Sequence, residues 1–168
     1  MKKVFIAYHL GKDDEYKNQF LEKFQEKINI TNESYYPEEV NDRLFSDQDL
    51  INKIKQEVLQ ATNVTIVLIG SETWKRKNVD WEIAASLQKP KSLILGIFLP
   101  TNNNYGFTKK LIDEKTIPAR LFENYKKGYL QLYNWNPISM KPFEWISAAE
   151  EQATQTAHNN LALLRQNR

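Results

Sequence analysis

The blocks VTIVLIG (residues 64–70), SETWKRKNV (71–79) and DWEIAASL (80–87) form the stretch that decides the fold of this chain. The first block is a β-branched run without polar alternation, which is typical of a strand buried on both faces. A polar turn follows, and the third block is a helix that carries Glu82 in or near its first turn. A strand–turn–helix unit places its turn at the carboxyl edge of a sheet, where open α/β folds bind ligands. We therefore predict that Glu82 is the main functional residue of the protein.

Strands and helices alternate on both sides of this stretch. Ser46 with Asp49 has the form of a helix start, whereas residues 108–126 mix charged and apolar residues and predict irregular or weakly helical structure. A short edge strand that Pro37 would end is expected within 34–36. The other expected strands are 4–8, 64–69, 92–99 and 129–135, and the expected helices cover 16–28, 50–58, the residues from Asn78 to Pro90, and a long final stretch from Pro142 through Leu164.

This alternation predicts a single α/β domain over residues 1–168, with a parallel sheet covered by helices on both faces. Five strands favour the flavodoxin-like, doubly wound order 2-1-3-4-5. In that order the loops 8–14 and 70–78 face each other across a crevice between the first and third strands. We expect the crevice to be lined or approached by the side chains of Tyr8, His9, Ser71, Trp74 and Glu82.

Composition excludes several function classes. The 23 basic and 21 acidic residues give a net charge of +2, which offers no electrostatic case for binding nucleic acid or a membrane surface. The absence of cysteine and the presence of only two histidines argue against disulfides, thiolate catalysis and a metal site. The longest apolar run, Leu93–Leu99, is too short to span a bilayer. The chain is therefore expected to be soluble and cytoplasmic.

Phosphate-binding and hydrolase motifs are also missing. The five glycines are scattered, so no GxGxxG or P-loop occurs. Ser71 does not lie in a GxSxG elbow, which argues against a hydrolase triad. A phosphoacceptor receiver shares the predicted strand order, but it carries an aspartate at the end of the third strand, where this chain has Gly70 and Ser71.

One carboxylate with aromatic and hydroxyl groups nearby suits a sugar-like or nucleotide-like ligand. Rings can stack on Trp74 or Tyr8, and a carboxylate accepts hydrogen bonds from ribose hydroxyls. Cleavage of an N-glycosidic bond passes through an oxocarbenium-like state, which a negative group in a dry cleft stabilises. If the base leaves as a neutral amide from a cationic ring, no general acid is needed, and one carboxylate is enough.

Each candidate also has a structural explanation. An acid near a helix start is favoured by the helix dipole, which would explain Glu82 without catalysis. Ser71 would form hydrogen bonds with backbone amides of the turn. Trp74 would cover the third helix, and Tyr8 would belong to the core. His9 has a pKa suited to proton transfer, but a histidine at a strand end is more often a satisfied structural group.

Three further features have mainly structural interpretations. Asp13 and Asp14 fit a solvated helix start, and the basic run 75–77 fits a solvated turn, with the alternative that it holds pyrophosphate oxygens. The alanine stripe of the last predicted helix is a packing face, either in the core or against a second subunit.

Three segments resemble a known family: VFIAYH (4–9), ATNVTIVLIGSETW (61–74) and Glu82 within WEI (81–83). They are similar to TIR domains, and most of all to the TIR-like proteins of bacterial anti-phage Thoeris systems, of the ThsB type, over roughly residues 3–100. The resemblance implies a flavodoxin-like fold and release of nicotinamide from NAD, which is a substrate and not a cofactor, by Glu82. It also implies a cyclic ADP-ribose isomer as messenger to a downstream effector, a phage-derived trigger and a homo-oligomer.

The chain departs from the family pattern beside the glutamate. Family members often carry tryptophan four residues before it and a small residue next, where this chain has Asn78 and Val79. Trp74 or Trp81 would then supply the aromatic surface near nicotinamide.

Two other functions fit the same residues. The first is a non-catalytic TIR-like signalling or oligomerisation module, which has no need of the group formed by Tyr8, Ser71, Trp74 and Glu82. The second is a nucleoside deoxyribosyltransferase-like enzyme, which also breaks an N-glycosidic bond with a glutamate. Tests with NAD and with nucleosides separate the three hypotheses.

Overall fold

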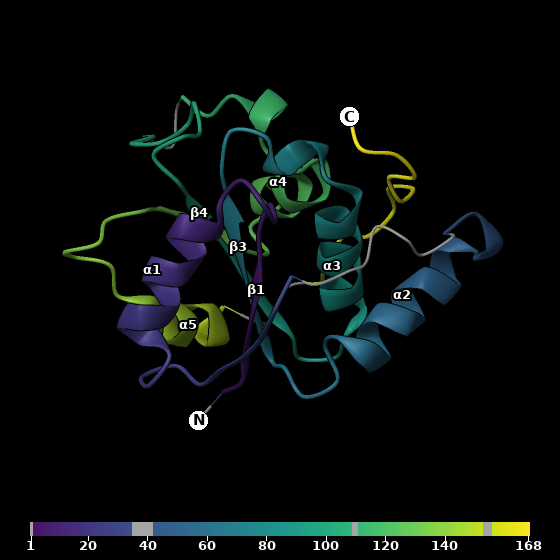
Figure 1. Ribbon diagram of the computed structural model, residues 1–168, viewed down its shortest axis with the longest axis horizontal. Coiled ribbons are helices and arrows are strands. Elements are labelled where there is room, and N and C mark those ends of the chain that lie inside the picture. Colours follow the sequence, from purple (N-terminus) through teal and green to yellow (C-terminus); the bar gives the residue numbers. More distant parts are fainter. Residues whose placement is uncertain (1, 35–41, 109–110, 153–155) are drawn as a thin grey trace.

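The computed structural model describes residues 2–34, 42–108, 111–152 and 156–168. Within them, one parallel sheet has the strand order β2-β1-β3-β4-β5. The parallel α/β fold predicted from the sequence is therefore confirmed, and Figure 1 shows the helices packed on both sides of the sheet. The strands are β1 (Val4–Ala7), β2 (Ile30–Glu33), β3 (Val64–Ile69), β4 (Leu93–Phe98) and β5 (Gln131–Asn134).

Two apolar clusters fill the space between the sheet and its helices. One lies under α2, α3 and α4 and includes Leu50, Ala84 and Leu121, and the other lies under α1 and α5 and includes Phe20 and Ile146. Figure 1 shows α1 and α5 on the opposite side of the sheet from α2 and α3. The helices are α1 (Asp14–Phe24), α2 (Asp47–Glu57), α3 (Lys77–Gln88), α4 (Ala119–Lys126) and α5 (Pro142–Glu151), with 3-10 turns η1 (Asp42–Leu44), η2 (Thr73–Lys75) and η3 (Glu114–Thr116).

The central strands follow the sequence prediction closely. Every residue of β1, β3 and β4 is buried, as expected for apolar runs covered by helices on both faces. Strand β1 pairs with β2 on one side and β3 on the other. The connections that follow β1 and β3 leave the sheet at its carboxyl edge, so the fold brings the loops after these strands together. The predicted start of α2 is also confirmed, because Ser46 accepts a hydrogen bond from the Asp49 amide at 3.1 Å.

The second strand lies earlier than predicted. Strand β2 ends at Glu33, and Ser34 follows it, whereas the predicted strand covered residues 34–36. Residues 35 and 36 lie outside the described residues. The strand consists of ITNE, and this polar sequence has no apolar run that would reveal it; it forms because Ile30 pairs with Val4 at the edge of the sheet.

Residues 108–126 contain more regular structure than expected. Helix α4 buries Arg120, Leu121 and Asn124 on one side. Two of these three buried residues are polar, so the helix lacks the apolar stripe by which a helix is recognised in a sequence. Their polar groups are satisfied by α3, by the helix itself and by the end of the chain.

The last helix is much shorter than predicted. Helix α5 ends at Glu151 instead of continuing through Leu164, and residues 153–155 lie outside the described residues. Residues 156–168, which we call the C-terminal strap, carry no helix and cross α3 on the side away from the sheet (Figure 1). The predicted alanine stripe is overridden because side chains of α2, α3 and α4 bond to the strap. These contacts include Leu163 N–H to Asp47, Leu164 N–H to Asp80 and His158 N–H to Asn124.

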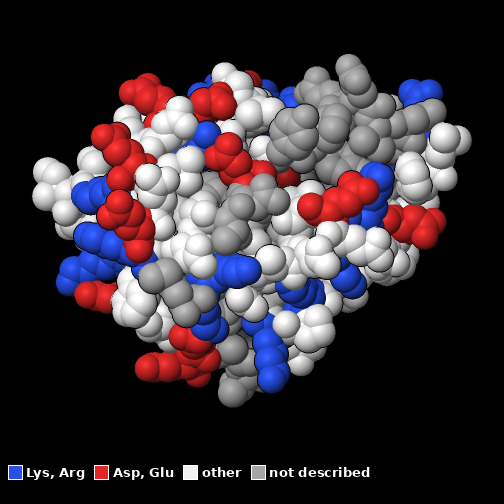
Figure 2. Space-filling model, turned by 60° about the horizontal axis from the view of Figure 1, so that its bottom comes forward, with Lys and Arg blue, Asp and Glu red and all other residues white. Residues whose placement is uncertain are grey.

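Two surface properties bear on possible partners. None of the described helices is long and apolar enough to cross a membrane. On the face drawn in Figure 2, Lys and Arg side chains are interspersed with Asp and Glu side chains, and neither sign forms a continuous surface.

Candidate functional site

Helix α3 is buried on all sides. Every residue from Val79 to Leu87 is buried, because the sheet, α2, α4 and the C-terminal strap surround the helix. Glu82 therefore lies in the second turn of a helix that begins at Lys77, and the acid in the first turn is Asp80. The helix dipole acts mainly on the first turn, so it gives no adequate reason for a buried acid at Glu82.

The carboxyl group of Glu82 is held at one oxygen only. The side chain is 1% exposed, and its Oε2 accepts a hydrogen bond of 2.6 Å from the Ser34 hydroxyl. Its Oε1 is buried and has no hydrogen-bond partner within the described residues. A buried carboxyl oxygen without a partner costs stability, so this oxygen is a candidate for contact with a ligand.

Ser34 connects Glu82 to the first strand. Its hydroxyl accepts the backbone N–H of Tyr8 at 3.0 Å, and its own N–H donates to the carbonyl of Ile6 at 2.8 Å. The carboxyl ends of β1 and β2 thus fix the hydroxyl that holds Glu82. Ser34 was not singled out from the sequence, where it appeared only as the first residue of a predicted strand.

Burial dominates the electrostatics of Glu82. It raises the pKa of the carboxyl group from 4.5 to about 8, and the hydrogen bond from Ser34 opposes that rise. With this pKa the carboxyl group is mostly protonated at neutral pH. A cationic group placed beside it would lower its pKa and favour the carboxylate.

Tyr8 lies close to this site but belongs to the core. Its side chain is 1% exposed, and its hydroxyl donates to Asp14 at 3.4 Å. Burial and the nearby carboxylates of Glu33 and Asp14 raise the pKa of Tyr8. The structural explanation of Tyr8 thus fits its burial, and its backbone N–H contributes to the site through Ser34.

The loops after β1 and β3 meet through Asp13. Thr73 donates to Asp13 Oδ2 at 3.3 Å and accepts the N–H of Gly70 at 2.8 Å. A Cβ atom at Gly70 would collide with the Asp13 carboxylate, which explains the glycine at the end of β3. Asp13 is 1% exposed, and burial raises its pKa to about 6, so its interpretation as part of a solvated helix start was wrong.

The other predicted site residues make no described contact with Glu82. No hydrogen bond or ring contact within the described part of the chain joins His9, Ser71 or Trp74 to Glu82. His9 is half-buried, its Nδ1 has no described partner, and burial and the charge of Arg76 lower its pKa. Ser71 and Trp74 are half-buried, and Trp74 borders a cavity whose lining does not include Glu82.

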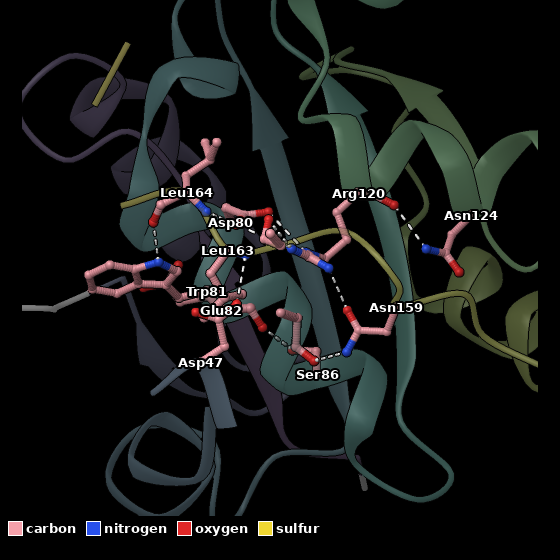
Figure 3. A network of polar contacts seen from close by, with 12 residues as sticks. Asp47, Asp80, Trp81, Glu82, Ser86, Arg120, Asn124, Asn159, Leu163 and Leu164 are labelled. Atoms are coloured by element: carbon pink, nitrogen blue, oxygen red, sulfur yellow. Dashed lines mark hydrogen bonds and ion pairs between the residues drawn. The ribbon is translucent and has the colours of Figure 1, made fainter. Parts of the chain in front are cut away.

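A buried ion pair fixes the first turns of α3. Arg120 donates to Asp80 through Nε at 2.9 Å and Nη2 at 3.4 Å, and the Leu164 N–H donates to the same carboxylate at 2.9 Å. Trp81 is 1% exposed and donates from its indole N–H to the Leu164 carbonyl at 2.7 Å. Figure 3 shows this network directly beside Glu82. Only the acid Asp80, two residues before Glu82, hints at this network in the sequence.

Replacement of Ser34 with alanine is expected to raise the pKa of Glu82 further. The substitution removes the hydrogen bond that lowers this pKa and leaves the Tyr8 N–H without its acceptor. We expect a loss of about 1–3 kcal/mol of stability and a carboxyl titration at higher pH, measured by NMR of the Glu82 side-chain carbon. Ser86→Ala is the matched control, because the Ser86 hydroxyl bonds to the Glu82 backbone carbonyl and not to its carboxyl group. An unchanged Glu82 titration in Ser34→Ala would contradict the assignment of Ser34 as the group that lowers the pKa of Glu82.

Comparison with known proteins assigns the family. No curated protein matches the chain. Among solved structures, the chain is similar to one titled "Structure of the activated Roq1 resistosome directly recognizing the pathogen effector XopQ (TIR domains)", with 13% identity, 94% of this chain and 87% of that chain covered, and a TM-score of 0.40. Residues 5–104 match the family model described as "Thoeris protein ThsB, TIR-like domain". The chain therefore belongs to the family of TIR-like domains of the Thoeris protein ThsB.

Proposed function

We propose that this protein cleaves the bond between nicotinamide and ribose in NAD, with Glu82 as the catalytic residue. The observation that carries the proposal is the buried carboxyl group of Glu82 at the carboxyl edge of the sheet, held by Ser34 at one oxygen and without a described partner at the other. Buried titratable groups with strongly shifted pKa values are concentrated at functional sites. Family membership supports a role in defence signalling.

The charge of the substrate fits the protonation of the site. The nicotinamide ring of NAD is cationic, so its binding beside Glu82 would lower the raised pKa and produce the carboxylate. In a water-poor site that carboxylate would stabilise the positive charge that develops on the ribose as the C–N bond breaks. The Ser34 hydroxyl would keep Oε2 in place while Oε1 accepts a hydrogen bond from a ribose hydroxyl.

The bond changes balance without a further cofactor. The electron pair of the breaking bond goes to the nicotinamide nitrogen, so nicotinamide leaves neutral. Either water or another part of the same ADP-ribose then attacks C1′, and one proton is released. Attack within the molecule gives a cyclic ADP-ribose isomer, and we propose that this product is a second messenger to a downstream effector.

The biological setting is part of the same proposal. We propose that the protein acts in the cytoplasm of infected bacteria, that a phage-derived trigger activates it, and that it works as a homo-oligomer. A non-catalytic module is less well supported, because such a module gains nothing from a buried carboxyl group that reduces its stability.

Product analysis distinguishes the alternatives. The purified protein is incubated with NAD, with and without lysate of phage-infected cells, and nicotinamide and ADP-ribose products are quantified by mass spectrometry. Release of nicotinamide supports the proposal, and the mass of the second product separates cyclisation from hydrolysis. Cleavage of nucleosides but not of NAD would favour a deoxyribosyltransferase-like enzyme. No cleavage of either substrate in the triggered sample would favour a non-catalytic module.

The pH dependence of turnover reports the state of Glu82. If the carboxylate is the working form, kcat/KM should rise about tenfold per pH unit below pH 8 and become constant above it, because kcat/KM reports the free enzyme. The kcat profile should also rise with pH, but its midpoint should lie below pH 8, because the bound cation lowers the pKa of Glu82. A kcat/KM that falls as pH rises through 8 would instead identify Glu82 as a proton donor.

A further inference from the structure

The cavity that Trp74 borders lies on the side of α3 that carries the C-terminal strap. Its volume is about 380 Å³, within the usual range for small-molecule sites. Its walls come from η2 and the start of α3, from η3 with the start of α4, and from the strap. Glu82, Tyr8, His9 and Ser71 do not line it, and its lining consists of Trp74, Arg76, Asp80, Glu114, Lys115, Ile117, Pro118, Ala119, Leu161, Ala162, Leu164 and Arg168.

The charges around the cavity favour an anion. Arg76, Lys115 and Arg168 contribute three positive charges, against the carboxylates of Asp80 and Glu114. Asp80 is already paired with Arg120 and the Leu164 N–H, so it adds little negative charge. Within the described residues, neither Lys115 nor Arg168 forms an ion pair. Their two positive charges, against the single carboxylate of Glu114, leave the side-chain charge at the cavity positive.

The remaining walls favour a planar, partly apolar group. Trp74 is half-buried, so part of its indole surface is accessible to a ligand. The strap contributes Leu161 and Leu164, and the opposite wall contributes Ile117 and Pro118. A tryptophan beside apolar walls and cations is a combination suited to an aromatic base that carries a phosphate.

We propose that this cavity binds a nucleotide of mononucleotide size, at a site separate from Glu82. The base would lie against Trp74 and the apolar walls, and the phosphate would face Lys115 and Arg168. Glu114 would accept a hydrogen bond from a sugar hydroxyl or an exocyclic amine. This binding does not depend on NAD cleavage.

Such a ligand would join the strap to the rest of the fold. The strap forms one wall through Leu161, Ala162 and Leu164, and its backbone is attached to Asp80 and Trp81 of α3. A ligand that contacts the strap, η3 and η2 together binds only the folded protein and therefore stabilises it. The nucleotide would thus reinforce the segment that holds the helix of Glu82.

Isothermal titration calorimetry with adenosine 5′-monophosphate tests the site. The full chain is titrated with this nucleotide and with adenosine, which keeps the base and lacks the phosphate. We expect the monophosphate to bind at least about tenfold more tightly than adenosine. Its affinity should fall about tenfold in Lys115→Gln and in Arg168→Gln, and further in the double variant. Lys141→Gln removes an exposed positive charge outside the cavity and should leave the affinity unchanged.

Glu82→Gln separates this site from the catalytic proposal. The variant should bind the monophosphate as the wild type does, because Glu82 does not line the cavity. Equal binding of nucleotide by the wild type and the Lys115→Gln/Arg168→Gln double variant would overturn the inference, as would the absence of binding. Loss of binding in Glu82→Gln alone would also overturn it, by placing the nucleotide at the Glu82 site.

Discussion

Glu82→Gln is expected to lose nicotinamide release and to gain folding stability in the same protein. Glutamine has nearly the same shape as the protonated glutamate side chain, but it cannot become the carboxylate that stabilises the developing cation. Removal of a preorganised electrostatic group of this kind lowers turnover by about 10²–10³-fold or more. Loss of activity in a more stable protein would exclude misfolding as its cause.

The gain in stability follows from proton linkage. The folded pKa of Glu82 is about 8 and the ordinary value is 4.5. Between these pH values the unfolded chain has released the proton that the folded chain keeps, so wild-type stability falls as pH rises through this window. Glutamine does not titrate, so the stability of the variant lacks this dependence on pH. Glu82→Gln should therefore be more stable than wild type by a few kcal/mol at pH 8, and the difference should disappear below about pH 4.5.

Urea denaturation at pH 4.5, 6 and 8 measures this difference. Glu22→Gln is a suitable control, because Glu22 lies exposed on α1. It should match wild type in both stability and turnover. A Glu82→Gln variant that is less stable than wild type at pH 8 would contradict a buried, protonated Glu82.

Arg120→Met is expected to cause the largest loss of stability. Arg120 is 1% exposed, and its side chain binds Asp80, Asn159 and the Ala162 carbonyl. Methionine fills similar volume but leaves the Asp80 carboxylate buried with only the Leu164 N–H as a described partner. Breaking a buried pair in this way typically costs about 3–5 kcal/mol.

A double-mutant cycle with Asp80→Asn separates the ion pair from packing. Asparagine removes the buried charge that Arg120→Met leaves uncompensated. The double variant should therefore be more stable, measured by urea denaturation, than the sum of the two single losses predicts. Additive losses would mean that Asp80 and Arg120 contribute to stability independently of each other.

The central strands β1, β3 and β4 could be predicted because each is an almost continuous apolar run. The limits of β3 coincide with the expected 64–69, and every residue of this strand is buried. The C-terminal strap could not be predicted, because its alanine pattern fits a helix. It is held instead by side chains distant in the sequence, such as Asp47 and Asp80.

The candidate site was predictable only in part. The role of Glu82 could be predicted from its place after β3 and from the family resemblance, and its burial is consistent with that prediction. Ser34 was not recognised as a site residue, and Asp13 was wrongly interpreted as solvated, because their partners, Glu82 and Thr73, come from other parts of the chain. A polar residue in a polar stretch gives no local sign that tertiary contacts will bury it.

The most direct test of the central claim is mass spectrometry of nucleotides from phage-infected cells that express either wild type or Glu82→Gln. The account predicts that NAD falls and that nicotinamide and a cyclic ADP-ribose isomer accumulate in infected wild-type cells, whereas cells with the variant at equal protein level show neither change. Equal accumulation of these products with the variant would contradict the assignment of Glu82.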